Sequence, residues 1–214
     1  MNWMKKVAVA LVCLLPLGLQ AAKVDTLQVK SPSMNKSIEV VVVSPDVAAT
    51  KACPVIYLLH GYGGNARTWV GIKPDLSKIA DEKGIFFVCP DGKNTWYWDS
   101  PLNADVRYET FISDELVKYV DSHYKTVADR KGRAITGLSM GGHGAMWNGL
   151  RHSDVFSAAG STSGGVDIRP FPKNWEMSVQ IGEKAKYPEN WEKYTVINLV
   201  PTLRKDQIAL IFDC

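Results

Sequence analysis

The chain has 214 residues, of which 46% are hydrophobic, and a formal net charge of +3 at pH 7. This length and composition favour one globular domain with a real core and exclude a repeat or low-complexity protein. The small net charge argues against nucleic acid or an anionic membrane surface as a partner.

Residues 1–22 have the organisation of a secretory signal peptide. Two lysines precede an apolar run at 7–19, and two alanines end the segment. A membrane anchor is the alternative, but the run is short for a bilayer span and contains Pro16. Removing the two lysines from a net charge of +3 leaves about +1. We therefore expect a secreted or periplasmic domain at 23–214 without a stable membrane anchor.

The domain alternates predicted strands with predicted helices. Apolar segments typical of strands lie at 37–43, 54–59, 84–89, 134–137, 156–160 and 207–212. Helical spacing of apolar residues occurs at 75–83, 108–124 and 141–150. This alternation predicts an α/β fold with a mainly parallel sheet covered on both faces. The proline-containing segment 166–206 is either a cap over the active face or a structural excursion.

Three cysteines remain after signal removal, namely Cys53, Cys89 and Cys214. Cys53 opens one predicted strand and Cys89 closes another. If these strands are parallel neighbours, the two thiols lie at opposite ends, too far apart for a disulfide. We expect no disulfide between them.

Residues 133–146 combine a short strand, a sharp turn and a helix, with Gly137-Leu138-Ser139-Met140-Gly141 at the turn. Small residues on both sides allow the strained backbone that lifts a serine hydroxyl above the end of a sheet. This pattern is typical of a nucleophile elbow, and it makes Ser139 a candidate nucleophile for acyl transfer. A glycine-rich structural turn is the alternative interpretation.

A second motif, His60-Gly61-Tyr62-Gly63-Gly64-Asn65, follows the predicted strand 54–59. Backbone amides in such a loop can stabilise the oxyanion that forms when a serine attacks a carbonyl. The residue after the nucleophile supplies one donor and the loop supplies the other. The sequence therefore predicts an oxyanion hole made by the amides of Tyr62 and Met140.

Both motifs resemble the esterase D family of α/β-hydrolases, which is similar to S-formylglutathione hydrolases, feruloyl and acetyl esterases, and mycolyltransferases. The segments 98–101 and 107–116 are similar to the region that precedes the elbow in those proteins, so the resemblance spans about 40–214. It implies an α/β-hydrolase fold and the same roles for Ser139, Tyr62 and Met140. No cofactor is required, and the scattered histidines and cysteines lack the spacing of a metal site.

The resemblance also implies that the domain lacks its final strand and helix. In this family the catalytic acid follows a strand like 211–214, and the histidine comes after one further strand. Asp213 could be proposed as the acid. The resemblance argues against it, because it aligns Asp213 with the end of the strand and puts the acid after that strand. We therefore expect residues 23–214 alone to be inactive and poorly soluble, with the catalytic acid and histidine encoded beyond residue 214.

The four histidines of the sequence have other expected roles. His60 is expected to orient the glycine-rich loop, and the ring of His143 should point along its helix, away from the Ser139 hydroxyl. His123 and His152 lie at helix ends, where a surface role suffices.

These observations predict a secreted serine carboxylic-ester hydrolase that acts through an acyl-enzyme on small or polysaccharide-linked esters. An acyltransferase with the same acyl-enzyme and a non-catalytic carbohydrate-binding protein are the alternatives. The aromatic run Trp96-Tyr97-Trp98 is either a substrate platform, with Trp98 as a binding residue, or ordinary core. The sequence leaves the ester and the oligomeric state open.

Overall fold

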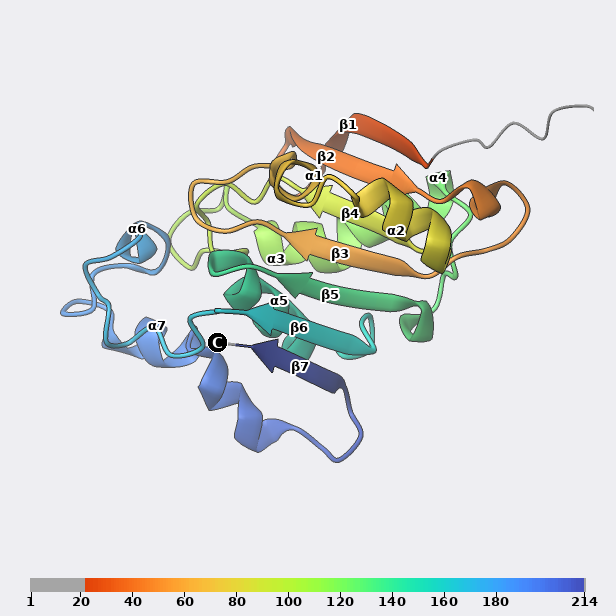
Figure 1. Ribbon diagram of the computed structural model, residues 1–214. Coiled ribbons are helices and arrows are strands. Elements are labelled where there is room, and N and C mark those ends of the chain that lie inside the picture. The colour runs from red at the N-terminus through yellow and green to blue at the C-terminus, as the bar shows by residue number, and fades with distance from the viewer. Residues whose placement is uncertain (1–21, 214) are drawn as a thin grey trace, which may run out of the picture.

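A seven-stranded sheet forms the centre of the computed structural model, which describes residues 22–213 (Figure 1). The strand order is β1-β2-β4-β3-β5-β6-β7. The bounds are β1 (Lys23–Ser31), β2 (Lys36–Ser44), β3 (Val55–Leu59), β4 (Phe86–Pro90), β5 (Arg133–Gly137), β6 (Ala158–Thr162) and β7 (Ala209–Asp213). The prediction of a signal peptide falls on residues outside the described part, apart from Ala22.

The sheet is mainly parallel, as predicted. Strands β4, β3, β5, β6 and β7 run parallel, while β2 pairs antiparallel with both β4 and β1. All six predicted strands are confirmed within a few residues. Strand β1 is an additional strand at the edge, and its mostly polar sequence lacks the apolar run that marks the others.

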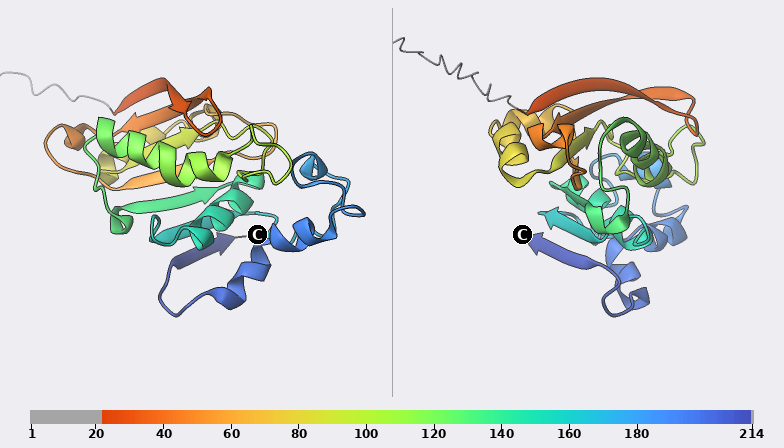
Figure 2. Two further views of the ribbon diagram at one scale, coloured as in Figure 1. Left: turned by 180° about the vertical axis from the view of Figure 1, so that it is seen from behind. Right: turned by 90° about the vertical axis from the view of Figure 1, so that its right-hand side faces the viewer.

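Helices cover both faces of the sheet (Figures 1 and 2). One face carries α1 (Thr68–Ile72) and α2 (Leu76–Lys83), and the other carries α3 (Tyr108–Thr110), α4 (Leu116–His123) and α5 (Met140–Arg151). A π-helical turn, Phe111–Glu115, joins α3 to α4, so the predicted helix 108–124 is one continuous helical segment. Short 3₁₀ turns lie at Asp46–Ala49 and Arg130–Gly132.

Each face has its own buried apolar cluster. The larger cluster joins α4 and α5 to the sheet and contains most of the buried aromatic residues, including Tyr57, whose ring packs edge-on against Phe156 at 5.7 Å. The smaller cluster packs Leu76 and Ala80 of α2 against β2, β3 and β4. Both faces of the central strands are thereby buried, which explains why these strands are continuously apolar.

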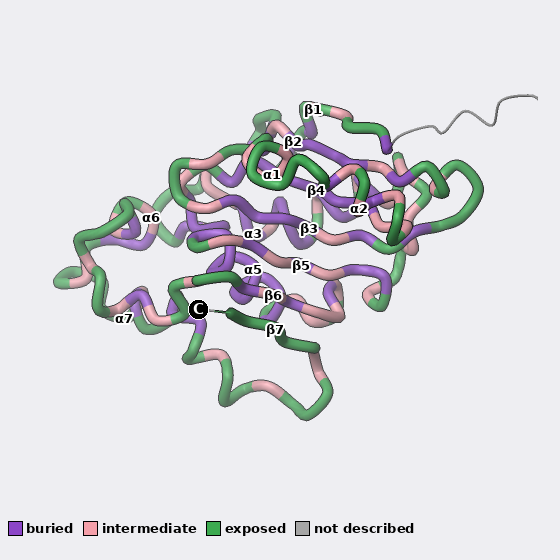
Figure 3. Tube along the Cα trace, in the orientation of Figure 1, coloured by how far each residue is buried: buried purple, intermediate pink, exposed green. Residues whose placement is uncertain are grey.

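The first part of the segment 166–206 lies at the carboxyl ends of the parallel strands, and its last part returns to the start of β7 (Figure 1). It contains α6 (Met177–Ile181), α7 (Pro188–Lys193) and a 3₁₀ segment, Val196–Thr202. Strand β7 forms the neighbouring edge of the sheet and is exposed along its whole length, with Ile211 and Phe212 74% and 76% exposed (Figure 3). An apolar, unpaired edge of this kind favours association between chains.

The structure contains Cys53 and Cys89 as free, buried thiols, as expected. Strands β3 and β4 are indeed parallel neighbours, so the two thiols lie at opposite ends of the pair. Within residues 22–213, no helix has both the length and the apolar character needed to cross a bilayer.

Candidate active site

Ser139 occupies the sharp turn between the end of β5 and the start of α5. Its backbone has φ 55° and ψ −116°, a conformation that non-glycine residues rarely adopt. Its amide donates to the Thr162 carbonyl at 2.8 Å, and its carbonyl accepts from the His143 amide at 3.0 Å. The side chain remains exposed, so the turn presents the Ser139 hydroxyl at the carboxyl end of the sheet.

Two glycines allow this turn to form. A Cβ on Gly137 would overlap the backbone of Gly141, and a Cβ on Gly141 would overlap the Leu59 carbonyl. The first turn of α5 therefore packs directly against the ends of β3 and β5. The Gly-x-Ser-x-Gly spacing thus has a steric cause in this chain.

The glycine-rich loop forms a β-turn beside Ser139. The Gly64 amide donates to the Gly61 carbonyl at 3.0 Å, and Gly63 has φ 76°, which glycine adopts without strain. A Cβ on Gly61 would lie only 3.5 Å from the Cβ of Ser139. The loop therefore lies within contact distance of the nucleophile.

The backbone amides around Ser139 divide into used and unused donors. The Gly63 amide donates to Asn94 Oδ1 at 2.9 Å, and the Gly64 amide donates within the turn. Within the described residues, no hydrogen bond uses the amide of Tyr62 or Met140. Two unused amides next to one serine are available for a ligand oxygen.

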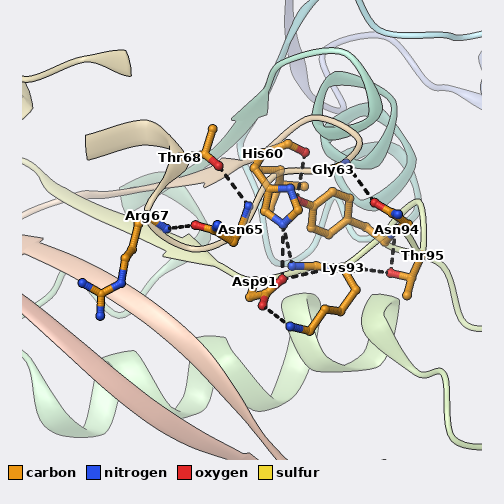
Figure 4. A network of polar contacts seen from close by, with 12 residues as sticks. His60, Gly63, Asn65, Arg67, Thr68, Asp91, Lys93, Asn94 and Thr95 are labelled. Carbon is orange, nitrogen blue, oxygen red and sulfur yellow. Dashed lines mark hydrogen bonds and ion pairs between the residues drawn. The ribbon is translucent and has the colours of Figure 1, made fainter. Parts of the chain in front are cut away.

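His60 fixes the direction of one of these amides. Its Nδ1 donates to the Gly61 carbonyl at 2.8 Å, while its Nε2 accepts from the Gly92 amide at 2.9 Å (Figure 4). The Gly61 carbonyl and the Tyr62 amide belong to the same planar peptide unit and point in opposite directions. By holding the carbonyl, His60 therefore also orients the Tyr62 N–H, in agreement with the orienting role expected for it.

Asp91 and Lys93 complete the polar network behind the loop (Figure 4). Asp91 Oδ1 lies 3.5 Å from His60 Nε2, and Asp91 Oδ2 lies 2.6 Å from Lys93 Nζ. Burial raises the pKa of Asp91, but the contacts with His60 and Lys93 outweigh this effect and lower the pKa to about 2. Asp91 is therefore a carboxylate at neutral pH.

A pocket of about 300 Å³ opens above Ser139 and Met140. Tyr62 and Trp96 line it, together with Phe171 and Trp175 from the segment 166–206. Its walls are mainly apolar and aromatic, a common composition for small-molecule sites. The exposed hydroxyl and the two unused amides thus belong to one concave site.

Comparison with known proteins shows the family of this chain. The model of the Esterase family, described as "Putative esterase", matches residues 31–210. The chain belongs to the Esterase family. An esterase of Mycobacterium tuberculosis is 31% identical over 149 residues, which are 66% of this chain and 32% of that protein. The chain therefore spans about a third of the length of this relative.

Solved structures show the same fold as this Esterase-family chain. A ferulic acid esterase is 28% identical with a TM-score of 0.71, over 91% of this chain and 79% of that chain. An S-formylglutathione hydrolase from Agrobacterium tumefaciens has a TM-score of 0.74 at 21% identity, over 90% of this chain and 75% of that chain. The α/β-hydrolase fold expected from the sequence is confirmed.

The structure buries Trp98, which the sequence suggested as a substrate-binding residue, and does not bring it to the pocket of this Esterase-family chain. The Trp98 side chain is fully buried, and its Nε1 donates to His143 Nε2 at 2.9 Å. It stacks beneath Trp96 at 5.6 Å, so Trp96 lines the pocket in its place. Three consecutive aromatic residues could not all face one pocket, and the sequence alone did not indicate which one does.

Among the described residues, no side chain hydrogen-bonds to the Ser139 hydroxyl, and the histidines are engaged elsewhere. The two ring nitrogens of His143 contact Trp98 and the Gly165 carbonyl, while those of His60 hold the glycine-rich loop. His152 contacts Glu109, and His123 contacts the Tyr119 carbonyl. Asp213 forms no ion pair with any of them.

His143 gives this Esterase-family fold a defined pH dependence. Burial lowers its pKa from 6.5 to about 4, which outweighs the opposite effect of the Gly165 hydrogen bond. The unfolded chain binds a proton on this ring below pH 6.5, whereas the folded chain binds it only near pH 4. The resulting stabilisation is therefore complete above pH 6.5 and is lost as the pH falls to about 4, an effect of about 3 kcal/mol.

Chemical denaturation of wild type and His143→Phe between pH 4 and 7.5 tests this expectation. The wild-type free energy of unfolding should fall through this range more steeply than that of the variant, whatever the absolute loss of stability in the variant. Parallel pH profiles for the two proteins would contradict a neutral, buried His143.

Several residues of the site carry no recognisable sequence signal. Asn94, Phe171, Trp175 and Glu176 lie in loops and have neither a periodic pattern nor a motif. Asn94 alone could have been predicted to lie near the site, because it follows β4 closely and loops at the carboxyl ends of parallel strands meet at one edge of the sheet.

Proposed function

We propose that this protein is a secreted or periplasmic serine carboxylic-ester hydrolase that acts through an acyl-enzyme. One observation carries the proposal: the exposed Ser139 hydroxyl shares a pocket with the unused amides of Tyr62 and Met140. A nucleophile beside two preorganised donors is the arrangement that acyl transfer requires. Membership of the Esterase family supports the same reaction class.

In the proposed mechanism, Ser139 Oγ attacks the carbonyl carbon of the ester and loses its proton to a base. The carbonyl π electrons move to the oxygen, which accepts hydrogen bonds from the Tyr62 and Met140 amides. When the C=O bond re-forms, the C–O bond to the alcohol breaks, and the alcohol leaves with the proton from the base. Water then attacks the acyl-enzyme in the same way and releases the acid and free Ser139.

We propose that the base is a histidine outside the residues described here. The engagement of His60, His123, His143 and His152 supports this assignment. Without a base, a serine is an ordinary alcohol, so residues 23–214 alone should have little activity. Experiments on the reaction therefore need the full-length product of the gene.

The substrate class that we propose is an acyl ester of a carbohydrate, or another small ester. The aromatic pocket walls support an apolar or aromatic acyl group, and the structural similarity to a ferulic acid esterase points the same way. The predicted signal peptide supports a substrate outside the cytoplasm. The residues of 166–206 that line the pocket act in this proposal as a cap that shapes ligand access.

Product analysis with the full-length protein tests the proposal. With 4-nitrophenyl acetate we expect free acetate, and an acid quench should leave one acetyl group on the peptide that contains Ser139. A soluble sugar acceptor should change the products little. Predominant acetyl-sugar would show an acyltransferase instead, and the absence of both turnover and adduct would favour a non-catalytic carbohydrate-binding protein.

A further inference from the structure

Two strained turns each contribute a tryptophan to the lining of the pocket. Trp175 and Glu176, just before α6, are consecutive non-glycine residues with φ 50° and 54°, and Trp96 and Tyr97 have φ 59° and 60°. Trp96 Nε1 donates to the Trp175 carbonyl at 3.0 Å, which joins the two turns. Strain of this kind persists only where surrounding contacts enforce it, and it is concentrated at ligand-binding sites.

Glu176 extends this connection to the glycine-rich loop. Asn94 Nδ2 donates to Glu176 Oε2 at 3.3 Å, and Asn94 Oδ1 accepts the Gly63 amide at 2.9 Å. Asn94 therefore bridges the segment 166–206 and the loop (Figure 4 shows the Asn94–Gly63 side of the bridge). Glu176 also lies beside the Tyr62 phenol, whose pKa is raised by desolvation and by this carboxylate.

The bridge acts on the peptide unit that adjoins the predicted oxyanion donor. His60 and the Gly64 amide hold the Gly61 carbonyl, which fixes the peptide unit before the Tyr62 α-carbon. Asn94 holds the Gly63 amide, which fixes the peptide unit after it. The first unit contains the Tyr62 N–H, and fixing the second unit keeps the two planes from rotating relative to each other about the Tyr62 α-carbon. Without Asn94, the exposed Gly63 amide would lose its hydrogen bond, and the second unit would lack this contact with a side chain.

We propose that Asn94 and Glu176 are positioning residues, which hold the oxyanion loop through the Gly63 amide and connect its geometry to the segment 166–206. The inference rests on the proposed function, because it assumes that the Tyr62 amide stabilises an oxyanion. Neither side chain touches the substrate in this scheme. Trp175, from the same strained turn, contacts the acyl group instead. One turn therefore supplies a residue that lines the pocket, Trp175, and a residue that holds Asn94, Glu176.

Steady-state kinetics of the full-length protein with 4-nitrophenyl acetate provide the first test. Asn94→Ala and Glu176→Ala should each lower kcat about 10-fold, because a misdirected donor loses part of its stabilisation of the transition state, with KM changed less than about twofold. Glu176→Gln keeps an acceptor oxygen for Asn94 and should retain nearly full kcat. The matched control, Glu183→Ala, removes an exposed glutamate of the same segment that pairs only with Lys186 at 3.5 Å.

Hydrogen exchange of the Gly63 amide provides a second test that needs no turnover. It should become at least about tenfold faster in Asn94→Ala and Glu176→Ala and stay unchanged in Glu176→Gln and Glu183→Ala. Unchanged kcat or unchanged Gly63 exchange in the two alanine variants would overturn the proposal, as would a Glu176→Gln variant as impaired as Glu176→Ala. A wild type without turnover would overturn the proposed function separately, and exchange alone would then decide whether the bridge holds the loop.

Discussion

Replacing Ser139 with alanine should lower ester turnover by the full-length protein about a millionfold, to nearly the uncatalysed rate. The substitution removes the only oxygen that the elbow presents to the pocket, while the alanine methyl group leaves the strained backbone and the packing of α5 in place. Turnover of 4-nitrophenyl acetate, measured at high protein concentration, gives the residual rate. Ser122→Ala, at the exposed end of α4, is the matched control and should retain wild-type turnover.

Retention of more than about a hundredth of wild-type turnover by Ser139→Ala would remove Ser139 from the mechanism. Circular dichroism and thermal unfolding of the variant should match the wild type. A loss of turnover that accompanied unfolding would therefore not count in favour of the assignment.

The second large effect is expected at Tyr62, where two substitutions separate the role of the backbone amide from the role of the side chain. Tyr62→Pro deletes the amide hydrogen and should lower kcat at least about 100-fold, the effect of removing one oxyanion donor. Tyr62→Phe keeps the amide and removes only the phenol, so kcat should change less than about threefold. Proline is compatible with the second position of a turn whose third residue, Gly63, has φ 76°, so we expect the proline variant to fold.

The contrast between the two variants is the measurement. Equal losses would indicate that the Tyr62 phenol takes part, or that the whole loop is disturbed. Gly63 exchange, measured on both variants, separates these two explanations, because only a disturbed loop would release the Gly63 amide from Asn94.

Much of the fold was predictable because the hydrophobic pattern and the glycine positions of the sequence match the burial and the sharp turns of the structure. Strands β3 and β4 are buried on both faces, so their sequences are continuously apolar. The elbow at Ser139 and the turn at Gly63 need glycines for steric reasons, and such requirements leave a mark in the sequence. Strand β1 was not predicted, because an edge strand with one solvated face needs no apolar run.

The details of the site were less predictable, because they depend on contacts between distant segments. Asn94 and Glu176 are 82 residues apart, and nothing in either segment specifies the other. Trp98 Nε1 donates to His143, whereas Trp96 Nε1 donates to the Trp175 carbonyl, and both partners lie far from these residues in the sequence. Irregular segments such as 166–206 follow no period from which such contacts could be inferred.

The most direct test of the central claim is a crystal structure of the full-length protein after reaction with a fluorophosphonate. We predict a covalent bond from Ser139 Oγ to phosphorus, with the phosphonyl oxygen about 2.7 to 3.1 Å from the amide nitrogens of both Tyr62 and Met140. An adduct on another residue, or a phosphonyl oxygen directed away from these two amides, would contradict the account.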